Sequence, residues 1–245
     1  MQARMSSTRL PGKVMLEVDE KNPVLYYVIK QISESKLCDE LVIATTTSVE
    51  DKKIVKFAKD MNISCFRGSV EDCLDRYYQC AKEFSLSTIV RITCDNPLID
   101  PTLVDDAILF YKSNSYDYVT NCRERTFPQG TEIEIFSFSA LEKAWKEAKK
   151  SSEREHVTPY LYNNPDQFKI FNIRNNENLS HLRWTVDRKE DLEFVKNIVS
   201  KIKKSPILMS DILKLLKIEP ELISINKDYV MNEGYLKSLK EDKKN

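Results

Sequence analysis

Hydrophobic positions along this chain alternate between helical spacing and short β-branched runs. In residues 22–36, Val24, Val28 and Ile32 fall on one stripe of a helix, and Pro23 suits its first turn. The same spacing predicts further helices at 50–61, 71–84 and 101–113. Strands are predicted between the helices at 40–46, 63–66 and 88–93. Because short connections join these segments, the first half of the chain predicts an α/β fold, a mostly parallel sheet with helices on both faces.

The pattern changes in the second half of the chain. Ile133 and Ile135 alternate with polar neighbours in TEIEIFSF, which predicts an antiparallel strand before a helix at 139–150. The segment RWTVD at 183–187 is expected to be a short strand that returns to the main sheet. A helix at 189–202 is expected to follow it.

The length of 245 residues suits a single sizeable core. We therefore expect one domain over 1–217 and a C-terminal extension over 218–245. The last ten residues, 236–245, are rich in Lys and poor in apolar side chains. This composition predicts a solvated tail rather than a partner site.

Composition excludes several classes of protein. Lys plus Arg and Asp plus Glu both total 38, so no overall positive field exists to hold a nucleic acid. The chain has no long apolar span, so no membrane association is expected. Six cysteines without a C-x-x-C pair, and no secretory signal, favour a reduced, cytoplasmic compartment. Any anion site must therefore be local.

A basic loop opens the chain. The segment QARMSSTRLPGK, residues 2–13, contains three cations and precedes the first acidic residue, Glu17. Loops at the carboxyl ends of central strands bind phosphates through backbone N–H groups, hydroxyls and cations. The candidate phosphate ligands in the loop are Arg4, Ser7, Thr8, Arg9 and Lys13. A solvated basic turn ending at Pro11-Gly12 is the alternative that local composition leaves open.

Asp95 follows a predicted strand in RITCDNPLIDP, residues 91–101. Ligands of open α/β sheets bind beyond the carboxyl ends of the strands. Mg²⁺ prefers hard oxygen ligands and shares its remaining positions between water and substrate phosphates, so Asp95 is a candidate metal ligand. The structural alternative is an Asx-type turn in which Asp95 caps its own backbone.

Asp187 ends the second candidate strand, in RWTVDRKEDLE at 183–193. Glu190 follows three residues later, a spacing that resembles a capping box for the next helix. Capping and metal binding are compatible, because a capping carboxylate keeps a second oxygen free.

Two later segments carry candidate substrate-binding groups, FPQGTEIEIF at 127–136 and SEREHVTPYLY at 152–162. His156 is one of two histidines, and its neighbours Arg154 and Glu155 could position a substrate carboxylate or hydroxyl. A hydrogen-bonded structural histidine is the alternative.

Glycine is scarce, with four in the chain, and three of them lie in the candidate segments: Gly12, Gly68 and Gly130. In a chain with so few glycines, we expect those present to lie where φ is positive or where a ligand comes close to the backbone.

Taken together, six ordered segments resemble the cytidylyltransferase superfamily, which includes the CMP-sugar-acid synthetases. The most similar branch is that of the SpsF-like spore coat polysaccharide biosynthesis proteins. The segments are QARMSSTRLPGK, GSVEDCLDRYY, RITCDNPLIDP, PQGTEIEIFS, REHVTPYLY and TVDRKEDLE, within residues 2–195. The resemblance implies a three-layer α/β/α nucleotide-diphospho-sugar transferase fold, Rossmann-like and mostly parallel. It also implies a homodimer, with a small antiparallel dimerisation arm formed by 130–138 and the region up to 173.

The resemblance assigns roles to individual residues. It implies that Arg4, Arg9 and Lys13 hold the triphosphate and that Asp95 and Asp187 bind Mg²⁺. Catalytic roles are expected for Arg4, Lys13, Asp95 and Asp187. Further nucleotide contacts are expected from Ser7, Thr8 and Thr45. Acceptor contacts are expected from Gln129, Glu132, Arg154, Glu155 and His156.

The chain departs from the family pattern at its start. Family members have Gly where Ser6 and Cys94 stand, and a full apolar strand before the equivalent of Gln2. We therefore expect a truncated first strand.

The leading hypothesis is an Mg²⁺-dependent nucleotidyltransferase that joins CTP to a sugar or sugar acid and releases pyrophosphate. Guanylyl or uridylyl transfer to a sugar phosphate would need the same phosphate loop and metal. A glycosyltransferase of the same fold is a second enzyme class, although no D-x-D metal motif occurs in the sequence. A non-catalytic nucleotide-binding protein is the third hypothesis.

Overall fold

The computed structural model describes residues 1–227, 229 and 233–243. Its strands are β1 (Val42–Thr46), β2 (Ser64–Gly68), β3 (Thr88–Arg91), β4 (Tyr118–Thr120), β5 (Glu134–Ser137) and β6 (Ile170–Asn172). β1 pairs with β2 in parallel, and a second group has the order β3-β5-β4-β6. β5 runs antiparallel to both β3 and β4, whereas β4 and β6 are parallel.

The first three residues join the two groups of strands. The Ala44 N–H donates to the Met1 carbonyl at 2.7 Å, and the Cys94 N–H donates to the Gln2 carbonyl at 3.0 Å. Gln2 thereby forms parallel bridges to Ala44 on one side and Thr93 on the other. A very short segment thus takes the central position of the sheet, and the loop that follows it starts at the carboxyl edge.

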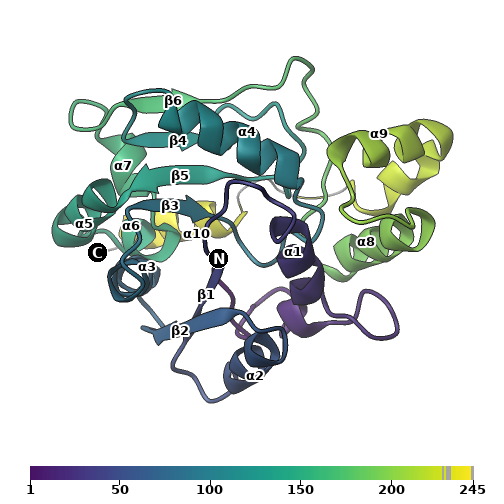
Figure 1. The fold of residues 1–245 in the computed structure, drawn as a ribbon, viewed down its shortest axis with the longest axis horizontal. Helices are drawn as coiled ribbons and strands as arrows, with labels where there is room; N and C mark the ends of the chain where they lie inside the picture. The colour runs from purple at the N-terminus through teal and green to yellow at the C-terminus, as the bar shows by residue number, and fades with distance from the viewer. Residues whose placement is uncertain (228, 230–232, 244–245) are drawn as a thin grey trace.

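Helices cover both faces of the sheet (Figure 1). They are α1 (Val24–Ile32), α2 (Lys52–Asp60), α3 (Cys73–Glu83), α4 (Pro101–Lys112), α5 (Phe138–Glu147), α6 (Ser151–His156), α7 (Pro159–Asn163), α8 (Lys189–Lys201), α9 (Met209–Ile218) and α10 (Glu233–Asp242). Two 3₁₀ turns are η1 (Lys13–Met15) and η2 (Pro220–Ile225).

The alternation of side chains along β4 and β5 separates two cores. Tyr118 and Phe136 pack with α3, α5 and α7 on one face. Val119 and Ile135 pack with α1 and α4 on the other. The predicted three-layer α/β/α arrangement is therefore confirmed.

A further core holds α8 and α9 beside the sheet, where Figure 1 shows them away from β6. Trp184 and Val186 are fully buried in this cluster, together with Phe194 and Val195 of α8. The segment before Asp187 is thereby fixed by apolar side chains on both sides.

Most predicted elements match the structure, and two do not, the strand at 183–187 and the solvated C-terminal tail. The segment 183–187 is not a strand, and a single bridge between Gln129 and Arg183 links it to the neighbouring loop. β5 lies between β3 and β4, so both its edges are paired within the subunit, and the predicted dimerisation arm over 130–138 and up to 173 stays a prediction. The homodimer itself stays a prediction.

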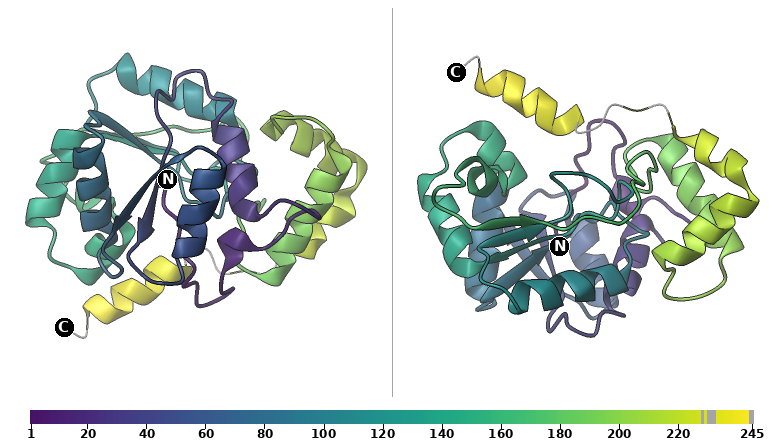
Figure 2. Two further views of the ribbon diagram at one scale, coloured as in Figure 1. Left: turned by 60° about the horizontal axis from the view of Figure 1, so that its bottom comes forward. Right: turned by 90° about the horizontal axis from the view of Figure 1, so that it is seen from above.

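The expected solvated tail is also wrong. Residues 236–242 belong to α10, which packs on α6, while 244 and 245 lie outside the described residues. In both views of Figure 2, α10 lies on the outside of the molecule, apart from α8 and α9. Its apolar residues are too few to predict docking, and polar contacts hold it instead.

Candidate active site

The basic loop folds back on itself at the carboxyl edge of the sheet. The Gly12 N–H donates to the Met5 carbonyl at 2.8 Å, and Gly12 adopts a φ of 70°, which favours glycine. The Met5 N–H donates to the Asp51 carboxylate at 2.8 Å. Lys13 follows this turn as the first residue of η1, so its position is set by the backbone of the loop.

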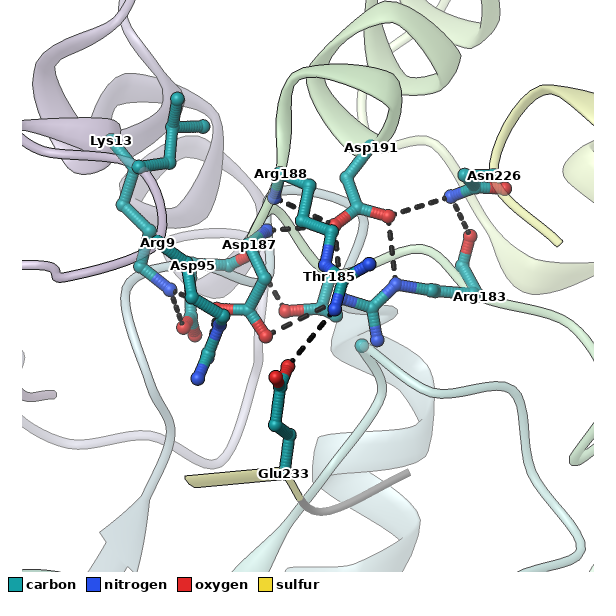
Figure 3. Close-up of polar contacts among 12 residues, drawn as sticks. Arg9, Lys13, Asp95, Arg183, Thr185, Asp187, Arg188, Asp191, Asn226 and Glu233 are labelled. Carbon is teal, nitrogen blue, oxygen red and sulfur yellow. Dashed lines mark hydrogen bonds and ion pairs between the residues drawn. The ribbon is translucent and has the colours of Figure 1, made fainter. Parts of the chain in front are cut away.

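Two carboxylates that are far apart in the sequence converge on Lys13 (Figure 3). The Lys13 ammonium donates to Asp187 Oδ1 at 2.6 Å and also to Asp95 Oδ2. The Arg9 guanidinium lies 2.8 Å from the same Asp187 oxygen. The side chains of Lys13, Asp95 and Asp187 are 11%, 21% and 15% exposed, so water screens the cluster only partly. The predicted meeting of the two aspartates beside the basic loop is what the structure shows.

The charges in this cluster support one another. Burial alone would lower the pKa of Lys13, but the Asp95 and Asp187 carboxylates outweigh it and raise that pKa. Burial alone would raise the pKa of Asp187, but the charges and hydrogen bonds of Lys13 and Arg9 hold it well below its usual range. Both groups are therefore ionised at neutral pH.

Asp191 fixes the segment that carries Asp187. Its carboxylate accepts from the N–H groups of Asp187 and Arg188, both at 2.9 Å, and from Arg183 Nε at 2.7 Å. Asn226 adds a further donor at 3.0 Å. Asp191 thus caps α8, the role that the sequence suggested for Asp187. The Asp187 carboxylate is left to face the cations.

The two aspartate segments are joined directly. The Val186 N–H donates to the Asp95 carbonyl at 2.8 Å, and Thr185 Oγ1 lies 3.3 Å from the same oxygen. On the far side, the Trp184 N–H donates to the Gln129 carbonyl at 2.6 Å. Gly130 permits this approach, because it has a φ of 104° and a Cβ there would lie 2.5 Å from the Thr185 nitrogen.

A cavity of about 360 Å³ opens beside this cluster. Its wall includes most of the predicted phosphate ligands and two predicted acceptor ligands: Arg4, Ser7, Thr8, Arg9, Lys13, Asp95, Glu155 and His156. Arg4 and Glu155 lie 3.8 Å apart. The basic loop and the segment around His156, about 150 positions apart in the sequence, therefore form one cavity.

Asp187 is not part of this wall but contacts it through Lys13 and Arg9. Four other predicted site residues also lie away from the wall, which corrects their expected placement. Thr45 is buried within β1. The backbone of Gln129 pairs with the 182–184 segment. Glu132 accepts from the Gly130 N–H at 2.9 Å and pairs with Arg125 at 2.5 Å. Arg154 pairs with Asp72 at 2.5 Å. Each of the last three is engaged in holding a loop or helix, so the geometry gives them structural roles.

Sequence analysis missed several residues of the cavity wall. Arg76 and Arg91 reach it from α3 and β3, and Arg91 pairs with the buried Glu134. Four residues of α10 also line it: Gly234, Lys237, Ser238 and Glu241. The signal that could have found the α10 residues is their spacing, which puts four small or polar side chains on one helical face.

The chemistry of the cluster fits a single Mg²⁺ ion. Within residues 1–227, 229 and 233–243, no group of three or more His, Cys, Asp or Glu side chains is arranged to hold a metal. Two carboxylates suffice for Mg²⁺, which usually takes one or two of them and completes its shell with water and substrate phosphates. Asp95 and Asp187 already converge on one cation, the Lys13 ammonium. The same two carboxylates would be the protein ligands of an Mg²⁺ ion.

No helix in the described part of the chain is long and apolar enough to cross a membrane.

The chain is similar to several known proteins. The chain is 36% identical to a cytidylyltransferase from Leptospira borgpetersenii of known structure, with a TM-score of 0.88 over 94% of this chain and 97% of that one. It is 32% identical to the spore coat polysaccharide biosynthesis protein SpsF of Bacillus subtilis, over 90% of this chain and 94% of that protein.

A more distant structure shares the fold. CMP:2-keto-3-deoxy-manno-octonic acid synthetase, solved with CTP, has a TM-score of 0.62 at 15% identity, over 82% of this chain and 96% of that one. The family model described as cytidylyltransferase matches residues 1–234, which include both aspartates and the basic loop. The chain belongs to the cytidylyltransferase family.

Proposed function

We propose that this protein transfers CMP from CTP to a sugar or sugar-acid acceptor and releases pyrophosphate, with Mg²⁺ as its cofactor. The observation that carries the proposal is the convergence of Asp95 and Asp187 on Lys13 and Arg9, beside the cavity. Family membership favours a cytidine nucleotide. Similarity to a protein of spore coat polysaccharide biosynthesis favours a sugar acceptor used in surface polysaccharide synthesis.

We assign the residues of the cavity different roles in the proposed reaction. Arg4, Arg9 and Lys13 would neutralise the triphosphate, and the Ser7 and Thr8 hydroxyls would donate to its oxygens. The acceptor hydroxyl would attack the α-phosphorus in line and lose its proton to solvent water as the bond to the pyrophosphate oxygen breaks. When bound by Asp95 and Asp187, Mg²⁺ would supply charge neutralisation at the phosphate and acceptor oxygens.

Pyrophosphate release tests the proposal. Purified protein is incubated with CTP, GTP, UTP or ATP and a panel of 2-keto sugar acids and sugar 1-phosphates, with Mg²⁺ or with EDTA. We expect release that needs CTP, an acceptor and Mg²⁺ together. Release of a nucleoside diphosphate from a nucleotide sugar, supplied in place of the triphosphate, would indicate glycosyl transfer. Nucleotide binding without any release would indicate a non-catalytic protein. Either result contradicts the proposal.

A further inference from the structure

The C-terminal helix α10 forms a wall of the cavity although most of it lies beyond the family match. The match ends at residue 234, and α10 spans Glu233–Asp242. Gly234, Lys237, Ser238 and Glu241 face the cavity. Their spacing of three, four and seven positions from Gly234 places them on a single face of the helix.

Polar contacts at three levels hold α10 against the rest of the molecule. At its start, Glu233 lies 3.1 Å from Arg188, next to the Asp187 segment (Figure 3). At its end, Asp242 accepts from the Ser152 N–H at 3.1 Å. Between them, the rings of Tyr235 and His156 form a T-shaped contact with their centroids 5.2 Å apart. These contacts fix the position of α10 against α6.

Ser238 is the buried centre of this contact, with 3% of its surface exposed. Its hydroxyl donates to Glu155 Oε2 at 2.6 Å, and its oxygen lies 3.0 Å from His156 Nε2. Because the hydroxyl has one proton, donating it to Glu155 requires His156 to donate from Nε2. Burial lowers the pKa of His156, so the ring is neutral at neutral pH and its Nδ1 is left as an acceptor.

The charge of this wall fits a polyhydroxylated ligand better than a triphosphate. Glu155 and Glu241 line the cavity here, and carboxylates would repel phosphates but accept hydrogen bonds from hydroxyls. Lys237 adds one cation, and in the part of the chain that the structure describes neither Lys237 nor Glu241 has an ion-pair partner. The basic loop, with its three cations, remains the wall for the triphosphate.

We infer that α10 is the outer wall of the acceptor site. Glu155, Glu241 and His156 bind acceptor hydroxyls, Lys237 binds an acidic group of the acceptor, and Ser238 is a positioning residue that orients Glu155 and His156. The inference rests on the proposed cytidylyl transfer and names the part of the chain that selects the acceptor.

The test is steady-state pyrophosphate release by the full chain and its variants Ser238→Ala, Ser238→Thr, Lys237→Ala and Glu241→Ala. The acceptor is the 2-keto sugar acid or sugar 1-phosphate that gives the fastest release. The matched control is Lys240→Ala, an exposed change in the last turn of the same helix that does not line the cavity.

Ser238→Ala is expected to raise the acceptor KM by about tenfold, the effect of losing one buried hydrogen bond, while the KM for CTP stays within about twofold. Ser238→Thr should recover part of the loss because it keeps the hydroxyl. Lys237→Ala should also raise the acceptor KM, because it removes the cation that binds the acidic group of the acceptor.

Three results would overturn the inference. An unchanged acceptor KM in all three alanine variants would show that α10 does not touch the acceptor. Equal rises in both KM values would show a general structural role. A lower acceptor KM would show that α10 obstructs the cavity. Wild-type protein that releases no pyrophosphate with any acceptor would instead refute the proposed function, and the inference with it.

Discussion

Replacing Gly130 by alanine tests how the Asp187 segment is positioned. Gly130 has a φ of 104°, and its Cβ would lie 2.5 Å from the Thr185 nitrogen and 2.6 Å from the Trp184 carbonyl carbon. These are backbone atoms and cannot rotate away. Backbone strain of about 1–3 kcal/mol adds to about 1–3 kcal/mol for a forced shift in a packed region, so we expect a loss of about 2–6 kcal/mol.

For a chain of this size about 1 kcal/mol corresponds to about 2–4 °C, so Tm should fall by about 4–24 °C in Gly130→Ala. The shift also moves Asp187, two residues beyond Thr185, and a displacement of about 1 Å can cost about a hundredfold in rate. Thermal unfolding followed by circular dichroism and pyrophosphate release measure the two effects.

Gly234→Ala is the matched control for stability. A Cβ at Gly234 would meet Arg9 at an ordinary contact distance of 3.7 Å, and the residue lies in a helix, where alanine is favoured by about 1 kcal/mol. Its Tm should be equal to or above that of the wild type. A Gly130→Ala protein with wild-type Tm and wild-type activity would refute the claim that this close approach positions the site.

Three further predictions concern charge and burial around the site. Because the pKa of Asp187 is held below its usual range, its contribution to stability is present above the unfolded value of about 3.9 and is lost as the pH falls toward the folded value. The free energy of unfolding of Asp187→Asn should therefore approach that of the wild type between about pH 5 and pH 2, and a constant difference in urea titrations would contradict this. Asp191→Ala should cost about 3–5 kcal/mol, because it leaves the Arg183 guanidinium buried without its partner and removes the cap of α8. Loss of under about 1 kcal/mol in the same titrations would show that the network is not stabilising. Burial raises the pKa of Cys94 to about 12, so its thiol should resist iodoacetamide at pH 8 until the protein unfolds, as peptide mass spectrometry can show; labelling of the native protein at Cys94 would contradict its burial.

The helices could be predicted because each carries a hydrophobic stripe that matches the helical period. α1, α4 and α8 begin and end within two or three residues of the predicted bounds, except for the end of α1, where the chain turns at Ser33. Such stripes depend on local spacing alone and not on contacts between residues far apart in the sequence.

Other features depend on contacts that local patterns do not encode. RWTVD has the composition of a strand, but its neighbour is the loop before Gly130, so one bridge forms instead of a ladder. The cap of α8 is Asp191 rather than Asp187, because Asp191 also pairs with the buried Arg183. α10 docks through Ser238 and Asp242, and such polar contacts leave no hydrophobic pattern.

The meeting of Asp95 and Asp187 came from the resemblance to a family and not from either segment alone. Local sequence favoured a turn for the first aspartate and a cap for the second. The fold brings both to the carboxyl edge of the sheet, where the backbone contact between Val186 and Asp95 holds them together.

The central claim is that these two carboxylates act as one site, and a double-mutant cycle in pyrophosphate release tests it most directly. Asp95→Asn and Asp187→Asn should each lower kcat/KM by at least about a hundredfold, and the double variant should be at most about tenfold worse than the weaker single variant. If the two losses multiply, or if either single variant keeps wild-type turnover, the aspartates do not form a common site and the account is wrong.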